Sequence, residues 1–226
     1  MILKVAATEV TKHVPKLWSR FVTFWRGTKL LVLGPGASGK SSFIDCLSDG
    51  ELRAPTDEHR ATAGIKPHPA VTLDIGADKR LIFRVKSIHE VAGQGNSALH
   101  HANMIATLRA KSVVVLLDFS AQGLNRIEWF RMFCDHLCSA LKKNTLDINR
   151  IRTFIICLNK FDLVKADDDA FNAARGEVRR EMMDRLHGAL SVEQIKSIRI
   201  MPCICIRTEH GKTFINDVIV ALARGD

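Results

Sequence analysis

Short apolar runs alternate with amphipathic stretches along most of the chain, beginning near residue 29. Some runs are apolar at nearly every position, which predicts strands buried on both faces of a sheet, and these cover 29–33, 112–118 and 152–158. Two further segments alternate apolar with polar residues on either side of residues 76–78, which predicts a hairpin of strands 71–75 and 81–85. A last strand is expected over 197–205.

Helical periodicity fills the intervals between these strands. One helix is expected just before residue 112, and the others cover 40–47, 126–142, 167–190 and 212–223. The polar stretch 49–68 predicts a loop with few core positions. Because strands alternate with helices, we expect an α/β fold: a doubly wound, mostly parallel sheet of about six strands with helices on both faces.

Length and composition suit one globular domain. The chain has 226 residues, of which 46% are hydrophobic and 25% charged, enough for a full core. We expect this domain over 29–226, preceded by an N-terminal extension over 1–28. No apolar run approaches the roughly 20 residues that span a bilayer. Neither a secretory signal nor a lipid-attachment motif is expected.

Charge and cysteine content indicate which kinds of partner and which cellular compartment to expect. The net charge of +9 favours contact with anionic surfaces. No zinc-finger pattern or aromatic–basic repeat accompanies that charge, so nucleic acid is not the expected partner. Most of the six cysteines fall in apolar segments, where a thiol behaves as a small hydrophobe. We therefore expect free thiols and a cytoplasmic location.

Residues 34–41, which we call the phosphate loop, match G-x-x-x-x-G-K-S/T between a predicted strand and a predicted helix. Gly36 and Gly39 allow the backbone N–H groups to wrap a phosphate, and the helix N-terminus adds positive potential. Lys40 is expected to reach the β- and γ-phosphates and to act in catalysis, and Ser41 to ligate Mg²⁺. The expected nucleotide contacts here are Gly34, Gly36, Ala37, Ser38, Gly39, Lys40, Ser41 and Ser42.

Asn159-Lys160-Phe161-Asp162 follows directly on the predicted strand 152–158. Here the sequence resembles the N-K-x-D guanine-specificity motif of the Ras-like GTPases. The Asp162 carboxylate can accept hydrogen bonds from the guanine N1–H and 2-amino group, which adenine cannot supply. Asn159 is expected to tie this loop to the phosphate loop and to read the base edge, and the Lys160 stem to pack over the base.

The resemblance extends to the two switch regions of that family. Glu90-Val91-Ala92-Gly93-Gln94 is similar to D-x-x-G-Q, with glutamate in place of aspartate. It implies that Glu90 lies on the Mg²⁺ side, that the Gly93 N–H senses the γ-phosphate, and that Gln94 orients the attacking water. The segment 60–65 resembles switch I of Arf-like members, which implies Thr62 as a Mg²⁺ ligand, with Thr56 as the competing threonine.

The segment 203–208 resembles the S-A-K base-packing loop of the family. The matching positions are Cys205, Ile206 and Arg207, and the Ile206 backbone would contact the guanine O6. A plain last strand explains the same apolar run equally well.

One competing assignment concerns the run that ends at Asp118. An apolar strand followed by Asp is typical of the metal-binding strand of P-loop ATPases, in which case Asp118 would be the Mg²⁺-side carboxylate. The GTPase interpretation also accounts for Gly93-Gln94 and for Asn159 to Asp162, which the ATPase interpretation leaves as accidents.

Residues 12–26 predict an amphipathic helix with aromatic residues opposite cations. Its apolar stripe consists of Val14, Leu17, Trp18, Phe21, Val22 and Trp25. Such a helix fits an anionic membrane interface, as Arf-like GTPases use theirs, or it packs on its own domain or on a partner chain.

Taken together, the resemblance implies a P-loop NTPase of the Ras/Arf superfamily. Its implied activity is slow hydrolysis of GTP to GDP with Mg²⁺, controlled by effector and regulatory proteins. Two alternatives stay open: a GTP-binding interaction module with little hydrolysis, suggested by Glu90, and a P-loop ATPase or kinase that uses Asp118.

Overall fold

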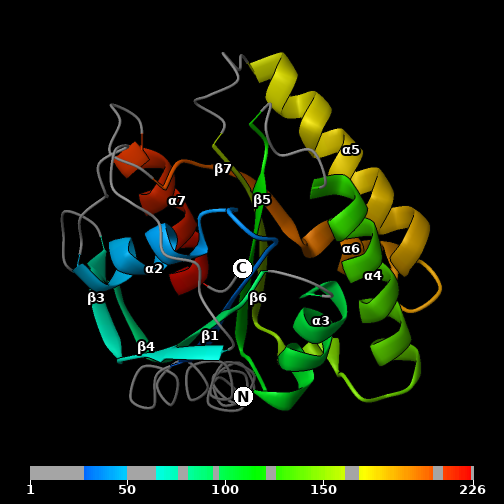
Figure 1. The fold of residues 1–226 in the computed structure, drawn as a ribbon, viewed down its shortest axis with the longest axis horizontal. Coiled ribbons are helices and arrows are strands. Elements are labelled where there is room, and N and C mark those ends of the chain that lie inside the picture. The colour runs from blue at the N-terminus through cyan, green and yellow to red at the C-terminus, as the bar shows by residue number, and fades with distance from the viewer. Residues whose placement is uncertain are drawn as a thin grey trace, which may run out of the picture.

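The computed structural model describes residues 28–49, 65–75, 81–93, 97–120, 126–160, 168–205 and 211–224. Within these ranges strands are interspersed with helices, and three strands follow one another over 65–91 (Figure 1). The strands are β1 (Thr28–Leu33), β2 (Ile65–His68), β3 (Val71–Ile75), β4 (Leu81–Val91), β5 (Ser112–Asp118), β6 (Thr153–Asn159) and β7 (Arg199–Cys203). The helices are α2 (Lys40–Asp49), α3 (Ser97–Thr107), α4 (Arg126–Lys142), the 3-10 helix η1 (Ile148–Arg150), α5 (Asp168–Leu186), α6 (Val192–Ser197) and α7 (Gly211–Arg224).

The described strands form one sheet in the order β2-β4-β1-β5-β6-β7, with β3 as a seventh strand paired to β4. Strands β4, β1, β5, β6 and β7 run parallel. Strands β2 and β3 are antiparallel to β4, and each pairs with a different stretch of it. The predicted α/β class and mostly parallel sheet are thereby confirmed, and the carboxyl ends of five strands lie at one edge.

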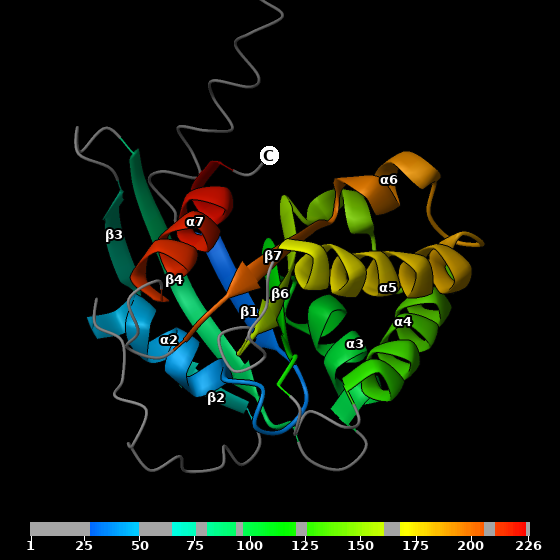
Figure 2. The ribbon, with the colours of Figure 1, turned by 90° about the horizontal axis from the view of Figure 1, so that it is seen from above.

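Alternate residues of the central strand β1 enter two separate hydrophobic clusters. Leu31 and Leu33 pack with side chains of α3, α4 and α5. Leu30 and Val32 pack with side chains of α2 and α7. Figure 2 shows these two groups of helices on opposite sides of the strands. This arrangement explains why β1, β5 and β6 are apolar at almost every position.

Three predicted boundaries need correction. Residues 65–68, expected to be part of a loop, form the edge strand β2, which pairs through its backbone although Ile65 is its one apolar residue. Strand β4 continues past residue 85 to Val91, because its second half pairs in parallel with β1. The helix expected over 167–190 ends at Leu186, and Ser191 begins α6 with a capping box that includes Gln194.

The structure also bears on the expected free thiols and on the expected lack of a membrane-spanning segment. All six cysteines are buried and free, as the apolar setting of most of them predicted. None of the described helices combines the length and hydropathy needed to cross a bilayer. Residues 1–27, which include the predicted amphipathic helix, lie outside the described ranges.

Candidate functional site

Two glycines of the phosphate loop hold backbone conformations that other residues rarely adopt. Gly34 has a φ of 145° and Gly39 a φ of 93°. A Cβ atom at Gly39 would lie 2.2 Å from Asn159 Nδ2, and one at Gly34 would lie 2.2 Å from the Leu116 carbonyl oxygen. Only glycine lets this loop pass so close to β5 and β6. The G-x-x-x-x-G spacing is therefore a packing requirement of the turn.

Lys40 begins α2 directly after this turn and is only 6% exposed. Its Nζ donates hydrogen bonds to the carbonyl oxygens of Gly34, at 2.9 Å, and Pro35, at 2.7 Å. Burial lowers the pKa of Lys40 to about 8, and the charge of Glu90 acts in the opposite direction. An added anion would relieve the cost of burying this cation. With the N-terminus of α2 beside it, Lys40 makes the loop a suitable anion site.

Two serines of the phosphate-loop region are also buried, Ser38 at 0% and Ser42 at 2% exposure. The hydroxyl oxygen of Ser38 has no hydrogen-bond partner within the described residues. A buried hydroxyl without a partner is uncommon in proteins. Ser38 therefore has a donor to offer a ligand that enters the loop.

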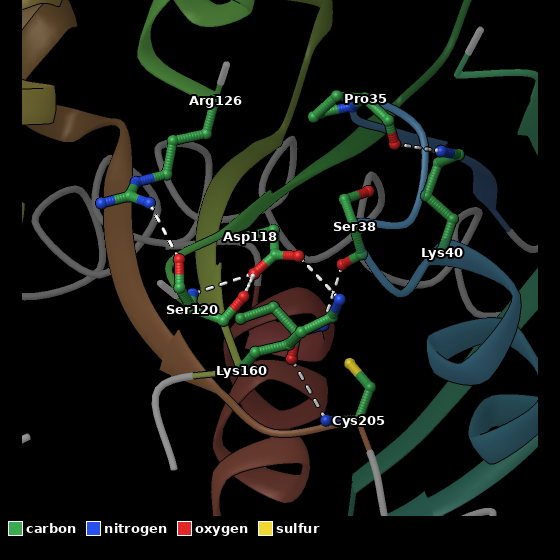
Figure 3. A network of polar contacts seen from close by, with 9 residues as sticks. Pro35, Ser38, Lys40, Asp118, Ser120, Arg126, Lys160 and Cys205 are labelled. Atoms are coloured by element: carbon green, nitrogen blue, oxygen red, sulfur yellow. Dashed lines mark hydrogen bonds and ion pairs between the residues drawn. The ribbon is translucent and has the colours of Figure 1, made fainter. Parts of the chain in front are cut away.

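Asn159, at the end of β6, connects three segments that are distant in sequence. Its Nδ2 donates to the Ser38 carbonyl oxygen at 2.8 Å, and its Oδ1 accepts from the backbone N–H of Cys205 at 3.2 Å. Figure 3 shows Ser38 and Cys205 on either side of this strand end. Asn159 is 1% exposed, so both bonds are shielded from water. Asn159 thus ties the end of β6 to the phosphate loop, and its expected contact with the base stays a prediction.

Lys160 and Asp118 form an ion pair beside this contact (Figure 3). Lys160 Nζ lies 2.6 Å from Asp118 Oδ2, and Asp118 Oδ1 accepts from the backbone and hydroxyl of Ser120. Burial opposes ionisation of Asp118, but the hydrogen bonds from Lys160 and Ser120 and the Lys160 charge lower its pKa. The Asp118 carboxylate is therefore engaged by residues at the ends of β5 and β6.

The Ser41 side chain contacts a different carboxylate, that of Glu90. Glu90 lies in β4, opposite Val32 of β1, and its Oε1 accepts from the Ser41 hydroxyl at 2.6 Å. The His68 ring lies 3.4 Å from the second carboxylate oxygen, from Nε2 to Oε2. Glu90 is 1% exposed. The structure thus brings together the predicted Mg²⁺-side pair, Ser41 and Glu90, and adds His68 from the edge strand.

These oxygens suit a hard cation. The Ser41 hydroxyl donates a hydrogen bond to the Glu90 carboxylate, so two oxygen-bearing side chains lie together beside the phosphate loop. Mg²⁺ at phosphate sites is commonly held by one or two protein oxygens together with substrate phosphates. Over the described ranges, no group of three or more His, Cys, Asp or Glu side chains is placed to hold a metal by itself.

Gly93 lies directly against the phosphate loop. Its carbonyl oxygen accepts from the Gly36 N–H at 2.9 Å. A Cβ atom at Gly93 would lie 2.4 Å from both the Gly36 nitrogen and the Pro35 carbonyl carbon. The loop after β4 and the phosphate loop are therefore in contact at a position that tolerates only glycine.

Several predicted site residues lie outside the described residues. They are Thr62, Gln94, Asp162, Ile206 and Arg207. Their roles stay predictions. Cys205 is described at the end of the segment that follows β7, and it is 2% exposed.

Polar residues that no sequence motif indicates support Ala92 and Gly93, which follow β4. His101 and Ser97 of α3 bond the carbonyl oxygens of Ala92 and Gly93, and Trp129 of α4 donates to Ser97. No motif indicates His68, in the short edge strand, either. The run His100-His101 is visible in the sequence, but nothing in it signals which ring turns inward.

No family model matches this chain, and a comparison with curated proteins likewise finds no match. The assignment of function therefore depends on the arrangement of Ser38, Lys40, Ser41, Glu90 and Asn159 at the carboxyl edge of the sheet.

Proposed function

We propose that this chain is a P-loop NTPase that binds GTP and GDP with Mg²⁺ and works as a guanine-nucleotide switch. One observation carries the proposal: the Asn159 side chain joins the Ser38 carbonyl of the phosphate loop to the Cys205 N–H of the segment after β7. The anion site and Asn159, the first residue of the N-K-x-D motif, thereby share one edge of the sheet, where α/β folds bind their ligands.

The phosphate end would be bound by Lys40 and by the backbone of the phosphate loop. A triphosphate would add negative charge beside the buried Lys40 ammonium and so offset the burial that lowers its pKa. Mg²⁺ would be held through Ser41 with Glu90 beside it, and it would neutralise charge on the phosphates. Thr62 is the second proposed metal ligand.

The base end would be read by Asp162, with Asn159 and Lys160 holding the segment in place. Lys160 has a φ of 60°, a conformation in which its side chain reaches Asp118. In this role Asp118 fixes Lys160 rather than a metal. The contacts of Asp118 thus favour the GTPase interpretation over the ATPase or kinase alternative.

Competition between GTP and ATP tests the base preference. We expect the parent chain to prefer GTP by at least about 100-fold, and Asp162→Asn to lose most of that preference because the guanine N–H groups lose their acceptor. Asp184→Asn on α5 serves as a control with the same change of charge. A parent chain that prefers ATP would contradict the proposal.

Asp118→Asn and Glu90→Gln together show which of the two carboxylates serves the Mg²⁺ site. If Asp118 only holds Lys160, this variant keeps Mg²⁺-dependent binding, whereas Glu90→Gln weakens it. The measurement is nucleotide affinity with and without Mg²⁺. Loss of Mg²⁺ dependence in Asp118→Asn with its retention in Glu90→Gln would favour the ATPase alternative.

Hydrolysis is proposed to be slow, with Gln94 orienting the attacking water and Lys40 stabilising charge on the γ-phosphate. Single-turnover hydrolysis in the parent and in Gln94→Leu tests this step. Equal and negligible rates would instead favour a GTP-binding interaction module, the alternative raised by glutamate at position 90.

Effector and regulatory proteins are the proposed partners, as a nucleotide switch requires. Residues 12–26 are proposed to contact an anionic membrane surface peripherally. Flotation with anionic liposomes, with and without residues 1–27, tests the membrane contact, and equal partitioning of the two chains would contradict it.

A further inference from the structure

Helix α3 holds two successive carbonyl groups of the loop after β4. The His101 Nε2 lies 2.9 Å from the Ala92 carbonyl oxygen, and the Ser97 hydroxyl donates to the Gly93 carbonyl oxygen at 3.2 Å. Because a carbonyl oxygen only accepts, His101 must carry its proton on Nε2. Trp129 Nε1 in turn donates to Ser97 Oγ at 2.8 Å. The backbone of this loop is thus fastened to α3 and α4.

The contact with Ala92 also determines where the Gly93 N–H points. Ala92 O and Gly93 N–H belong to the same peptide group, and no cis peptide bond occurs in the described chain. In a trans peptide the C=O and N–H bonds point in opposite directions. With the carbonyl held by His101, the Gly93 N–H is turned away from α3. Rotation of this peptide would first have to break the bond to His101.

The surroundings of His101 do not suit a residue retained only for packing. The ring is 0% exposed and meets Trp129 edge to face at 5.4 Å between centroids. Its Nδ1 is buried without a hydrogen-bond partner among the described residues. An apolar side chain would avoid that unpaired nitrogen. What the imidazole provides beyond an apolar side chain is the Nε2–H bond to Ala92.

We propose that His101 is a positioning residue that sets the orientation of the Ala92–Gly93 peptide, and with it the Gly93 N–H that senses the terminal phosphate. This inference rests on the proposed function, in which that N–H contacts the γ-phosphate of GTP and has no counterpart to contact in GDP. His101 touches no phosphate itself. It acts through the peptide plane, so its removal should affect the triphosphate selectively.

A pair of near-isosteric variants tests this role. His101→Gln retains an N–H donor, whereas His101→Met has similar reach and no donor. We expect His101→Met to lower affinity for a non-hydrolysable GTP analogue about tenfold, as loss of one hydrogen bond to a charged group requires, and to change GDP affinity less than about twofold. His101→Gln should recover most of the loss. Thermal unfolding with GDP bound checks that both variants are folded.

The outcomes separate this inference from the proposed function. Equal losses for GTP and GDP, or no loss in His101→Met, would overturn the positioning role alone. A parent chain that binds neither nucleotide would overturn both. If neither variant folds, the parent decides by ¹⁵N NMR: the Gly93 amide signal should shift with the GTP analogue and not with GDP, and equal shifts would overturn the inference.

Discussion

Two regions of this molecule are held by polar contacts of similar length, yet they differ in burial and in what they connect. At the carboxyl edge of the sheet, Asn159 is 1% exposed and bonds the backbone of two distant segments. Between α4 and α5, two ion pairs have nitrogen-to-oxygen distances of 2.6 Å: Arg131 Nη2 to Glu181 Oε1, and Arg185 Nη1 to Asp135 Oδ2. There, the Arg131 and Asp135 side chains are 46% and 54% exposed.

The energetic consequences of a lost contact differ accordingly. A buried backbone group that loses its partner costs roughly 1–3 kcal/mol, because it cannot turn to water. An exposed ion pair contributes about 0–1 kcal/mol, because water and salt screen it and its side chains lose entropy. Bond length therefore does not identify the functional region. Burial and the identity of the partner do.

The largest expected effect comes from filling the space at Gly39. In Gly39→Ala the new methyl group would overlap Asn159 Nδ2 at a φ of 93°, so we expect nucleotide binding to fall more than about 100-fold and stability to fall by several kcal/mol. Titration with fluorescent nucleotide and urea unfolding measure the two quantities.

Gly176→Ala in α5 is the matched control, because a Cβ there meets nothing within 4 Å. It should leave binding unchanged and stabilise the helix by about 0.5–1 kcal/mol. If Gly39→Ala and Gly176→Ala changed nucleotide binding and stability equally, the contrast between the sheet edge and the α4–α5 surface would be contradicted.

Asn159→Ala should have the next largest effect. It leaves the Ser38 carbonyl and the Cys205 N–H without their partner, which we expect to cost about 2–4 kcal/mol of unfolding free energy. Guanine-nucleotide affinity should fall with it. Asn159→Asp keeps the acceptor for Cys205 but buries a carboxylate oxygen against the Ser38 carbonyl oxygen, so it should cost at least as much as Asn159→Ala. A loss below about 1 kcal/mol in Asn159→Ala would place this contact in the same class as the exposed ion pairs.

The third effect is a pH dependence that arises from His101. Burial lowers the pKa of its ring to about 4, with the Ala92 bond opposing the shift, whereas an unfolded histidine titrates near 6.5. The unfolded chain thus binds the proton first, and stability falls as pH drops from about 6.5 to 4, by roughly 3 kcal/mol in all. Urea unfolding of the parent and His101→Met across this range measures the difference. An identical pH dependence in both chains would contradict it.

The smallest effect is expected at the surface ion pairs. Glu181 accepts from both Arg131 and Arg185, and these hydrogen bonds, that from Arg131 most of all, lower its pKa against the opposing effect of burial. Even so, Glu181→Gln should change the unfolding free energy by no more than about 1 kcal/mol and leave nucleotide affinity unchanged. Added salt should reduce the difference further. A loss as large as that of Asn159→Ala would show that this cluster is more than a solvated surface.

Much of the site was accessible from the sequence because its signals are local. The turn from β1 to α2 needs glycine at 34 and 39 and a cation at 40, and these residues lie within one short stretch of the chain. Strands β5 and β6 can be recognised in the sequence from their long apolar runs. Strand β2 could not be recognised in this way, because its pairing with β4 uses backbone groups that any sequence carries.

The sequence by itself determined the alternation of strands and helices over most of the chain, the glycine-rich turn and the buried character of the central strands. It did so because backbone conformation and periodicity depend on neighbouring residues. Only the tertiary structure decided that Glu90 and not Asp118 meets Ser41, that Asn159 joins Ser38 to Cys205, and that His101 holds Ala92. Those contacts depend on sheet order and strand register, which bring together side chains that the linear sequence leaves far apart.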